Sequence, residues 1–400
     1  MLQRLSNIFT FHPGWLALLA ALGLTGIGIT AIATVPHEVD YAARQGQWLA
    51  IALLVMLPFA FPHPKLIGDA SYPLLVVTIL LLVFVILPGM PESVVPVRNG
   101  IRAWIDLKFM LFQPSELAKI AFILALAWYL RHRSSYRTLT GLLVPFAIMF
   151  LPVLLILRQP DLGSAVLFAP VLFAMLVAAG ARMRHMATLA VLASLSVAYV
   201  FLSILFDAYI PAWMQVLKGY QRDRIRAMLD LVQDGTLYIT DQAYQQYKAM
   251  TLIGSGQGTG LGAERSATII RFNWLPEAHN DMIFAVIVNR WGWSGAMIVL
   301  SLFVLLIGSL LLIAVRSKDP FARLVVVGFA ALLFTQMTIN IGMAIGLLPV
   351  IGITLPFVSY GGSSLLTAFM MIGLAFNFAS ARASIIHQPS FEYDYADLAA

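Results

Sequence analysis

Long apolar runs separated by short polar connections dominate this sequence. They cover residues 13–35, 47–61, 70–89, 114–130, 141–157, 164–180, 185–206, 282–315, 322–348 and 362–381. A helix needs about 20 apolar residues to cross the hydrocarbon core of a bilayer, and most of these runs approach or exceed that length. The pattern therefore predicts an all-α, polytopic integral membrane protein with ten transmembrane helices.

Basic residues in the connections predict how these helices are oriented, since ten spans place both termini on one side. The short connections and tails on that side carry Arg4, Lys65, Arg131, Arg133, Arg137, Arg182, Arg184, Arg316, Lys318, Arg323 and Arg382. The short connections on the opposite side carry only Arg44, Arg98, Arg102, Lys108 and Arg158. Because Lys and Arg accumulate on the cytoplasmic side of a membrane, we expect both termini in the cytoplasm.

The polar connection at residues 207–280 is far longer than the others and forms one large extracytoplasmic loop between the seventh and eighth predicted spans. Within it, residues 213–231 place apolar side chains loosely on one helical face, with Arg222, Arg224 and Arg226 elsewhere. One interpretation is a helix lying on the membrane surface against lipid headgroups. The other is a basic lip that attracts an anionic lipid substrate.

Composition narrows the class of protein further. Hydrophobic residues make up 60% of the chain and charged residues 11%, against about 25% charged residues in an average soluble domain. The net charge of +6 is spread over short connections, which argues against nucleic acid as a partner. The absence of cysteine excludes disulfides and thiolate metal sites. No linker divides the sequence, so we expect residues 1–400 to form a single membrane domain.

Charged residues at the outer ends of the predicted spans are candidates for chemistry, because ionisable groups at membrane depth are unfavourable unless they are paired or hydrated. Arg102 and Trp104 precede the fourth span, which begins near Pro114 and carries Glu116 and Lys119 on one helical face. The alternative is structural. In that case Glu116 and Lys119 pair with each other, and Trp104 is an interfacial side chain.

Two further connections on the same side carry candidates. Arg158 and Asp161 lie between the fifth and sixth spans, and Asp161 is also a suitable N-cap for the sixth. Glu277, His279 and Asp281 end the long loop where it enters the eighth span. Asp281 is either an N-cap or a proton acceptor, the role that a carboxylate at this depth suits.

Glycine and proline mark two irregular segments. Residues 254–262 have glycine at every second position, with no preceding strand and no Walker lysine, so we expect a flexible hinge rather than a nucleotide-binding loop. Residues 340–364 place proline, glycine and small polar residues between two apolar helices. A broken backbone at that depth belongs where protein packs around it or where it lines a wet cavity. We therefore expect Ser359, Tyr360, Gly361 and Gly362 to shape a cavity floor or to pack in the core.

Five of these segments resemble, in order, the motifs of the SEDS family (shape, elongation, division and sporulation), the membrane polymerases of bacterial peptidoglycan. They are Asn99-Gly100 with Trp104, Gln113-Pro114-Ser115-Glu116 with Lys119, Gln159-Pro160-Asp161-Leu162-Gly163, Leu275-Pro276-Glu277 with His279 and Asp281, and residues 340–364. The Asn340-Ile341-Gly342-Met343 start is more typical of the RodA branch than of the FtsW branch.

The resemblance implies a peptidoglycan glycosyltransferase in the bacterial cytoplasmic (inner) membrane that polymerises lipid II during cell elongation, with its active site on the extracytoplasmic side. Asp281 corresponds to the catalytic aspartate of the family. We expect Lys119 to assist it, paired with Asp281 at rest, and Arg102 and Arg158 to help stabilise the leaving diphosphate. The other substrate-binding candidates are Trp104, Glu116, Asp161, Glu277, His279, Ser359, Tyr360, Gly361 and Gly362. A magnesium or manganese ion at the diphosphate is plausible, although no ligand cluster indicates one.

The family also implies a partner, a class B penicillin-binding protein transpeptidase, within the elongation machinery. One departure stands out, since Asn289 and Arg290 occupy positions where the family usually has an acidic pair. We expect Arg290 to have a partner such as a carboxylate, backbone carbonyls or water. Three alternatives stay open: a lipid II flippase, a non-catalytic scaffold for the penicillin-binding protein, and, within the family, an FtsW-type role in division.

Overall fold

The computed structural model describes residues 11–36, 38–98, 101–206, 219–234, 241–273 and 275–380. Its helices are α2 (Pro13–Ile32), α3 (Tyr41–Ala60), α4 (Pro64–Asp69), α5 (Ser71–Ile86), α6 (Pro114–His132), α7 (Leu143–Arg158), α8 (Leu162–Val166), α9 (Phe168–Ala178), α10 (Met183–Leu205), α11 (Gly219–Asp234), α12 (Asp241–Gly256), α13 (Gly262–Asn273), α14 (Ile283–Arg316), α15 (Pro320–Ala344) and α16 (Gly362–Ser380). Two short 3₁₀ turns, η1 (Ser135–Arg137) and η2 (Thr140–Leu142), precede α7. Each predicted apolar run coincides with a helix or, for residues 164–180, with the pair α8 and α9.

Six of these helical segments are long and apolar enough to cross a membrane: α2, η2 with α7, α10, α14, α15 and α16. The α5 helix and the α8–α9 pair are equally apolar but shorter. The α3 and α6 helices have the length but carry polar side chains such as Gln45, Glu116 and Lys119. The protein is thus a mostly helical, multi-pass membrane protein.

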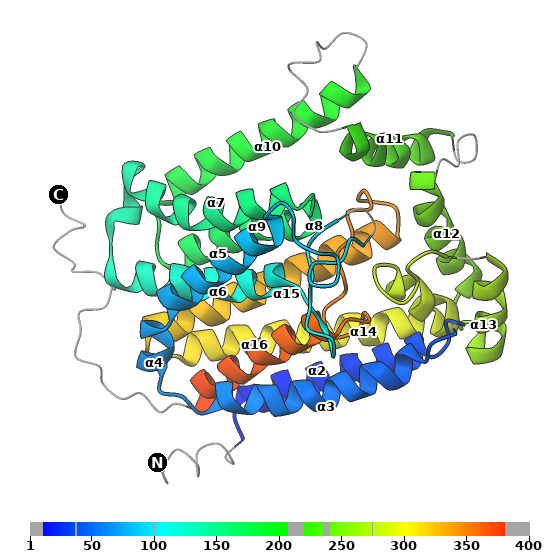
Figure 1. Ribbon diagram of the computed structural model, residues 1–400, viewed down its shortest axis with the longest axis horizontal. Helices are drawn as coiled ribbons and strands as arrows, with labels where there is room; N and C mark the ends of the chain where they lie inside the picture. The colour runs from blue at the N-terminus through cyan, green and yellow to red at the C-terminus, as the bar shows by residue number, and fades with distance from the viewer. Residues whose placement is uncertain are drawn as a thin grey trace.

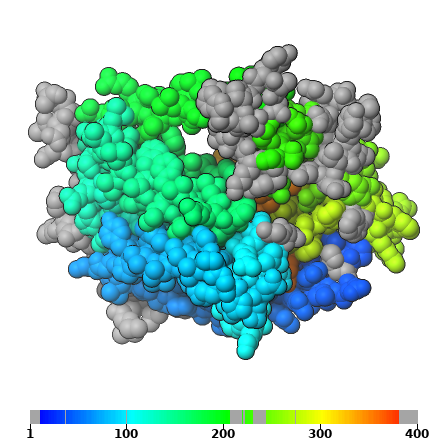
Figure 2. Space-filling view, turned by 45° about the horizontal axis from the view of Figure 1, so that its top comes forward, coloured from blue at the N-terminus to red at the C-terminus, as the bar shows by residue number. Residues whose placement is uncertain are grey.

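Helices α15 and α16 form the centre of the bundle. In their most apolar stretches 61% and 72% of the residues are buried, against 11% for α10. Helix α16 packs along α3, and α15 packs against α6 and α9. Figure 1 shows α2 and α3 on one side of this centre and α5, α6, α7 and α9 on the other. Helix α10 lies apart from the other spans, and a hollow opens beneath it in the space-filling view (Figure 2).

The described part of the long loop forms three helices that pack onto the bundle, with α12 and α13 lying against α14. The predicted surface helix at 213–231 appears as α11, which begins at Gly219 and ends at Asp234, while residues 213–218 lie outside the described residues. The glycine-rich segment is a packed junction rather than the free hinge we expected. An added Cβ at Gly256 would lie 2.3 Å from the Val288 carbonyl oxygen, so the two backbones are in contact.

A small β-hairpin, absent from the sequence prediction, precedes α6. Strands β1 (Ile105–Asp106) and β2 (Leu111–Phe112) pair antiparallel, with Ile105 opposite Phe112. Directly after β2, the Gln113 amide donates a hydrogen bond to Ser363 Oγ at the start of α16 (3.2 Å). The hairpin therefore fixes the N-terminal end of α6 against α16.

Candidate active site

The chain between α15 and α16 is irregular, as predicted, and side chains from other elements satisfy its backbone carbonyls. Gln246 of α12 donates to the carbonyls of Met343 and Leu348 (3.0 and 2.7 Å). Asn340 of α15 donates to the carbonyl of Ile353 (2.6 Å). Because a bilayer offers no water to free carbonyls, these amide side chains allow residues 345–361 to leave the helical conformation.

Asp281 lies against this segment, two residues before α14 begins. Its carboxylate is close to Gly352, where an added Cβ would lie 3.6 Å from Asp281 Oδ2. Gly352 adopts φ +75°, a left-handed conformation that favours glycine. The main-chain carbonyl of Asp281 accepts a hydrogen bond from Asn340 Nδ2 (2.8 Å). The main chain of Asp281 is therefore held in place by Asn340. The Asp281 carboxylate faces Gly352, which has no side chain.

The residues before Asp281 form hydrogen bonds with the segment just before α16. Ser359 Oγ donates to the Asn280 carbonyl (2.7 Å), and the Tyr360 amide donates to the His279 carbonyl (2.9 Å). The His279 ring stacks on Tyr41 with centroids 4.6 Å apart and the planes 6° from parallel. The structure thus brings His279 and Asp281 together with Ser359 and Tyr360, a pair from a distant part of the sequence.

Burial raises the pKa of Asp281 to about 7, and the nearby Glu277 carboxylate adds to this effect. Arg224 of α11 acts in the opposite direction, and Asp161 raises this pKa slightly further. Asp281 lies outside the α14 helix, two residues before its first residue, Ile283. A carboxyl group with a pKa near neutrality exchanges its proton readily at physiological pH, which is what general base catalysis requires.

Lys119 does not pair with Asp281, contrary to our expectation. Its Nζ donates to Glu116 Oε1 (2.7 Å), and both side chains are buried. Thr367 of α16 donates to the other oxygen of Glu116 (3.1 Å). The alternative of a self-paired Glu116 and Lys119 is therefore correct: the three-residue spacing on α6 places them on one face.

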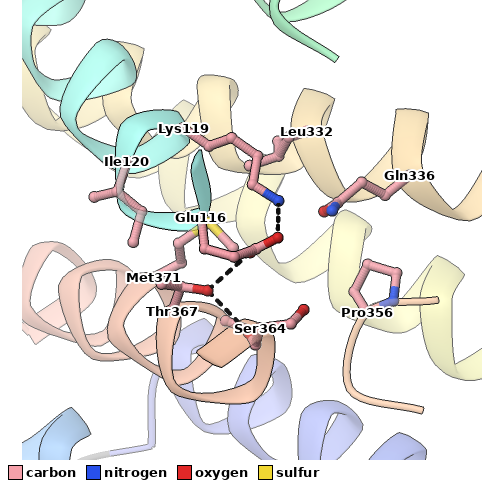
Figure 3. Close-up of a pocket in the computed structure, with 10 residues that line it drawn as sticks. Glu116, Lys119, Ile120, Leu332, Gln336, Pro356, Ser364, Thr367 and Met371 are labelled. Carbon is pink, nitrogen blue, oxygen red and sulfur yellow. Dashed lines mark hydrogen bonds and ion pairs between the residues drawn. The ribbon is translucent and has the colours of Figure 1, made fainter. Parts of the chain in front are cut away.

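A small cavity lies beside this pair. It is lined by Glu116, Lys119, Ile120, Leu332, Gln336, Pro356, Ser364, Thr367, Ala368 and Met371 and has room for about one water molecule. Figure 3 shows the Lys119 ammonium and the Gln336 amide pointing toward the same space. The cavity joins α6, α15 and α16 to Pro356 of the irregular segment.

Asp161 caps α8, as one of its two interpretations predicted. Its Oδ1 accepts from the Ser164 amide (2.9 Å), and its Oδ2 accepts from Ser164 Oγ (2.6 Å) and Gln113 Nε2 (3.3 Å). The following Gly163 touches the irregular segment, since an added Cβ would lie 2.6 Å from the Ile351 carbonyl oxygen. The Asp161 motif therefore supports residues 351–352, which face Asp281.

The remaining candidates lie at different positions around this centre. Arg102 and Trp104 are half-buried before the hairpin, and Arg158 is exposed at the end of α7. Within the described ranges these three side chains make no hydrogen bond or ion pair, so their part in substrate binding stays a prediction. Glu277 is half-buried at φ +51° and accepts a hydrogen bond from Asn280 Nδ2. Gly361 donates its amide to Gln45 Oε1 (3.2 Å), and Gly362 packs on the Trp48 ring.

Comparisons with known proteins identify the family of this chain. The family model for FtsW, RodA and SpoVE, described as "Cell cycle protein", matches residues 10–384. The chain belongs to this family. It is 32% identical over 339 residues to the peptidoglycan glycosyltransferase MrdB of Escherichia coli K12, covering 84% of this chain and 85% of that protein. It is 34% identical over 362 residues to a probable peptidoglycan glycosyltransferase FtsW of Thiomicrospira cyclica, covering 88% and 79%.

Solved structures agree with the assignment to the FtsW, RodA and SpoVE family. The rod shape determining protein RodA of Thermus thermophilus superimposes with a TM-score of 0.64 at 26% identity, covering 91% of this chain and 95% of that one. A chain from a structure described as "Structural coordination of polymerization and crosslinking by a peptidoglycan synthase complex" gives a TM-score of 0.73 at 29% identity, covering 91% and 96%. The SEDS resemblance noted from the motifs is confirmed.

The unusual Asn289 and Arg290 of this family member are both well bonded. Asn289 is fully buried, donates to the Leu252 carbonyl (3.0 Å) and Ser255 Oγ (2.7 Å), and accepts from Ser266 Oγ. It therefore holds the two loop helices α12 and α13 on α14. Arg290 donates to the Thr30 carbonyl of α2 and to the hydroxyl of Thr34, two residues after α2 ends, so its partners are a backbone carbonyl and a hydroxyl rather than a carboxylate.

Arg224, Asn340, Gln246 and Thr367 are contributors to the site that sequence reasoning did not single out for it. Arg224 had been assigned either to a helix on the membrane surface or to a basic lip for an anionic lipid substrate; its Nη1 donates to the Val350 carbonyl of the irregular segment (3.1 Å). Asn340 had served only as a branch marker. For Asn340 and Thr367 the signal that the sequence offered was a polar side chain within an apolar run, which in a membrane protein needs a partner. Arg224 and Gln246 lie in the polar loop, where no such signal marks them.

A divalent cation at the diphosphate stays a prediction. In the parts of the chain that the structure describes, no three His, Asp or Glu side chains gather closely enough to hold a metal ion. Glu277 and Asp161 both raise the pKa of Asp281, but the three carboxylates do not form a ligand set. The residues present therefore do not make a dedicated metal site, and no step of the mechanism below depends on one.

Proposed function

We propose that this protein is a peptidoglycan glycosyltransferase that polymerises lipid II into glycan strands during cell elongation. The observation that carries the proposal is the buried Asp281, with its raised pKa, against the irregular segment at Gly352. The printed names of MrdB and FtsW, peptidoglycan glycosyltransferase and probable peptidoglycan glycosyltransferase, support this class of reaction. Residues 1–400 would act as one membrane domain with ten spans and cytoplasmic termini, in the bacterial inner membrane, with the site on the extracytoplasmic side.

The reaction would be an inverting glycosyl transfer. The 4-hydroxyl oxygen of the acceptor N-acetylglucosamine attacks the anomeric carbon of the donor, and Asp281 takes the hydroxyl proton. The bond between that carbon and the diphosphate oxygen breaks, and the polyprenyl diphosphate leaves with the electron pair. Asp281 must be ionised before it can act, and a pKa of about 7 makes this form available near neutral pH.

Charge that develops on the leaving diphosphate needs preorganised cations or donors. We assign Arg102, Lys119 and Arg158 to this task. Lys119 is held at rest by Glu116, with Thr367 on the second carboxylate oxygen, so its position is fixed before substrate arrives. Arg224 joins this set because it reaches the same irregular segment at Val350 and its charge acts on Asp281.

A transpeptidase partner fits this activity. The structural neighbour from a peptidoglycan synthase complex comes from a study of coordinated polymerisation and crosslinking. By resemblance, a class B penicillin-binding protein would crosslink the new strands here. We favour catalysis over a flippase because the candidate residues gather at one end of the bundle rather than near the midplane, where transporters place their sites.

The experiment is polymerisation of purified lipid II by the full-length protein, alone and with its transpeptidase partner, with the partner's own catalysis blocked. Wild type should give glycan ladders and Asp281→Asn should give none, while both remain folded in detergent. Ladders of equal intensity from both proteins would remove the base assignment. No ladder from wild type in either condition would favour the scaffold or flippase alternatives.

A further inference from the structure

Asn340 is a fully buried side chain that bonds two separate stretches of the site at once. Its Nδ2 donates to the Asp281 carbonyl (2.8 Å) and to the Ile353 carbonyl (2.6 Å). A reversed amide would place its oxygen against two carbonyl oxygens, so the orientation is determined by the partners. Asn340 Oδ1 is buried without a hydrogen-bond partner among the described residues. The two donated bonds therefore carry the role of this side chain.

These two acceptors flank the contact between Asp281 and Gly352. One belongs to Asp281 itself, and the other belongs to Ile353, the residue after Gly352. Residues 350–354 lie outside any helix or strand, so no regular hydrogen-bond ladder holds this stretch in place. A single amide on the rigid α15 helix thus sets the separation between the Asp281 main chain and the loop that its carboxylate faces.

We propose that Asn340 is a positioning residue, which holds Asp281 at a fixed place against the Gly352 loop for the glycosyl transfer. This inference rests on the proposed function. Asn340 touches main chain only, so it acts through Asp281 rather than on substrate. Misplacement of a reacting group by about 1 Å lowers a rate by roughly a hundredfold. We therefore expect the Asn340 side chain to affect the rate more than its two hydrogen bonds affect stability.

The chain contains a closely matched control at the other end of the bundle. Asn377 of α16 is also buried, and its Nδ2 also donates to two main-chain carbonyls, those of Phe59 (3.1 Å) and Pro62 (2.7 Å). Phe59 lies in the last turn of α3 and Pro62 in the connection from α3 to α4, so neither acceptor belongs to the Asp281 site. Removing the Asn377 amide removes the same number and kind of bonds without touching Asp281.

The test compares Asn340→Leu with Asn377→Leu in the full-length protein. Melting temperature, kcat and KM for lipid II polymerisation, and the pH dependence of kcat are measured for both. We expect both variants to lose melting temperature to a similar extent, because a buried amide with two bonds is lost in each. Only Asn340→Leu should lower kcat by roughly tenfold to a hundredfold, with KM little changed.

The pH profile separates positioning from a merely structural role. The charged groups facing Asp281 are Glu277, Asp161 and Arg224. Releasing the Asp281 main chain would let water reach the carboxylate, so the acid limb of the Asn340→Leu profile should move to lower pH. The acid limb of Asn377→Leu should coincide with that of wild type.

Equal effects of the two substitutions on kcat and on the acid limb would overturn the inference and leave Asn340 a structural residue. If Asn340→Leu does not fold, the smaller Asn340→Ser and Asn377→Ser carry the same comparison. A wild-type protein that makes no glycan would overturn the proposed function and the inference together. Active wild type with an equally active Asn340→Leu would overturn the inference alone.

Discussion

Lys119 illustrates how much of an ion pair a sequence can predict. Its pairing with Glu116 follows from helical spacing, because side chains three residues apart on α6 share a face whatever surrounds them. The pairing with Asp281 that we expected requires two elements to meet at a set distance. That distance depends on how α6 and α14 pack, and here Glu116 and Thr367 surround the Lys119 site instead.

The Glu116 and Lys119 pair supports a prediction on double variants. Breaking a buried pair by changing one partner destabilises a protein by about 3–5 kcal/mol, so Lys119→Met should lower the melting temperature as well as the activity. The double variant Glu116→Gln/Lys119→Met should regain much of the stability, because no buried charge is left unpaired. Melting curves in detergent and lipid II polymerisation measure the two effects. Recovery of activity together with stability would contradict a role for Lys119 at the substrate.

The raised pKa of Asp281 predicts opposite pH effects on activity and stability. The base must be ionised, so polymerisation should fall as the pH drops below about 7. For stability, the folded-state pKa exceeds the unfolded value of about 4, so folding favours the protonated form. That stabilisation is complete below the unfolded pKa and is lost as the pH rises through the folded pKa. Asp281→Asn should therefore gain melting temperature relative to wild type between pH 5 and pH 8.

The same titration has a clear control. Glu277, Arg224 and Asp161 face Asp281, so the wild-type acid limb reports this group in its charged surroundings. Arg224→Met should raise the pKa of Asp281 further and move the acid limb to higher pH. A limb that stays in place would show that another group limits the rate.

At the scale of elements, helix α14 shows how an apolar helix and the long loop at residues 207–280 are joined. Its backbone departs from helical geometry at Gly292, with φ 64° and ψ −153°. The Trp293 amide donates to the Gly258 carbonyl (3.2 Å), and the Asn289 carbonyl accepts from the Leu261 amide (3.0 Å). The glycine-rich turn therefore satisfies the groups that the break in α14 leaves free, which is how an interrupted helix persists in a membrane protein.

This junction predicts a strong effect of one methyl group. An alanine Cβ at Gly292 would lie 2.5 Å from the Gly258 carbonyl oxygen, and the residue would keep a positive φ. Gly292→Ala should therefore destabilise the protein by at least about 1–3 kcal/mol. Gly308→Ala in the same helix meets open space and should be neutral or stabilising by up to about 1 kcal/mol. Thermal unfolding of both variants in detergent tests this contrast. Equal melting temperatures would contradict close packing between Gly292 and Gly258.

At the scale of the whole molecule, six helical segments among the described residues are long and apolar enough to cross a membrane, and the other apolar runs form shorter or more polar helices. The polar ones are not incidental, because α6 carries Glu116 and Lys119 into the bundle. A helix that lines a functional site is less apolar than one that only faces lipid. The ten-span topology is therefore tested by finding on which side of the membrane each connection lies, because hydropathy alone does not identify the polar spans.

The absence of cysteine makes that test simple. Ser93, before the hairpin, and Ser134, between α6 and η1, are both exposed. We expect a membrane-impermeant thiol reagent to label Ser93→Cys from outside and Ser134→Cys only after the membrane is opened. The wild-type protein is the blank. Labelling of both positions from the same side would contradict the predicted orientation.

The sequence by itself determined the class of the molecule, the positions of its long apolar helices and the motifs that surround the site, but not the loop helices α12 and α13. Apolar runs report helices because burial in lipid requires an internally bonded backbone, and the motif residues Asp281, Glu116 and Asp161 lie where their local patterns predicted. Only the tertiary structure decided which side chains meet. These contacts join segments that are distant in the sequence. Asn340 bonds to Asp281, Gln246 bonds to Met343 at the end of α15, and Asn289 bonds to the loop helix α12. Such contacts depend on how helices pack in three dimensions, which no local periodicity encodes.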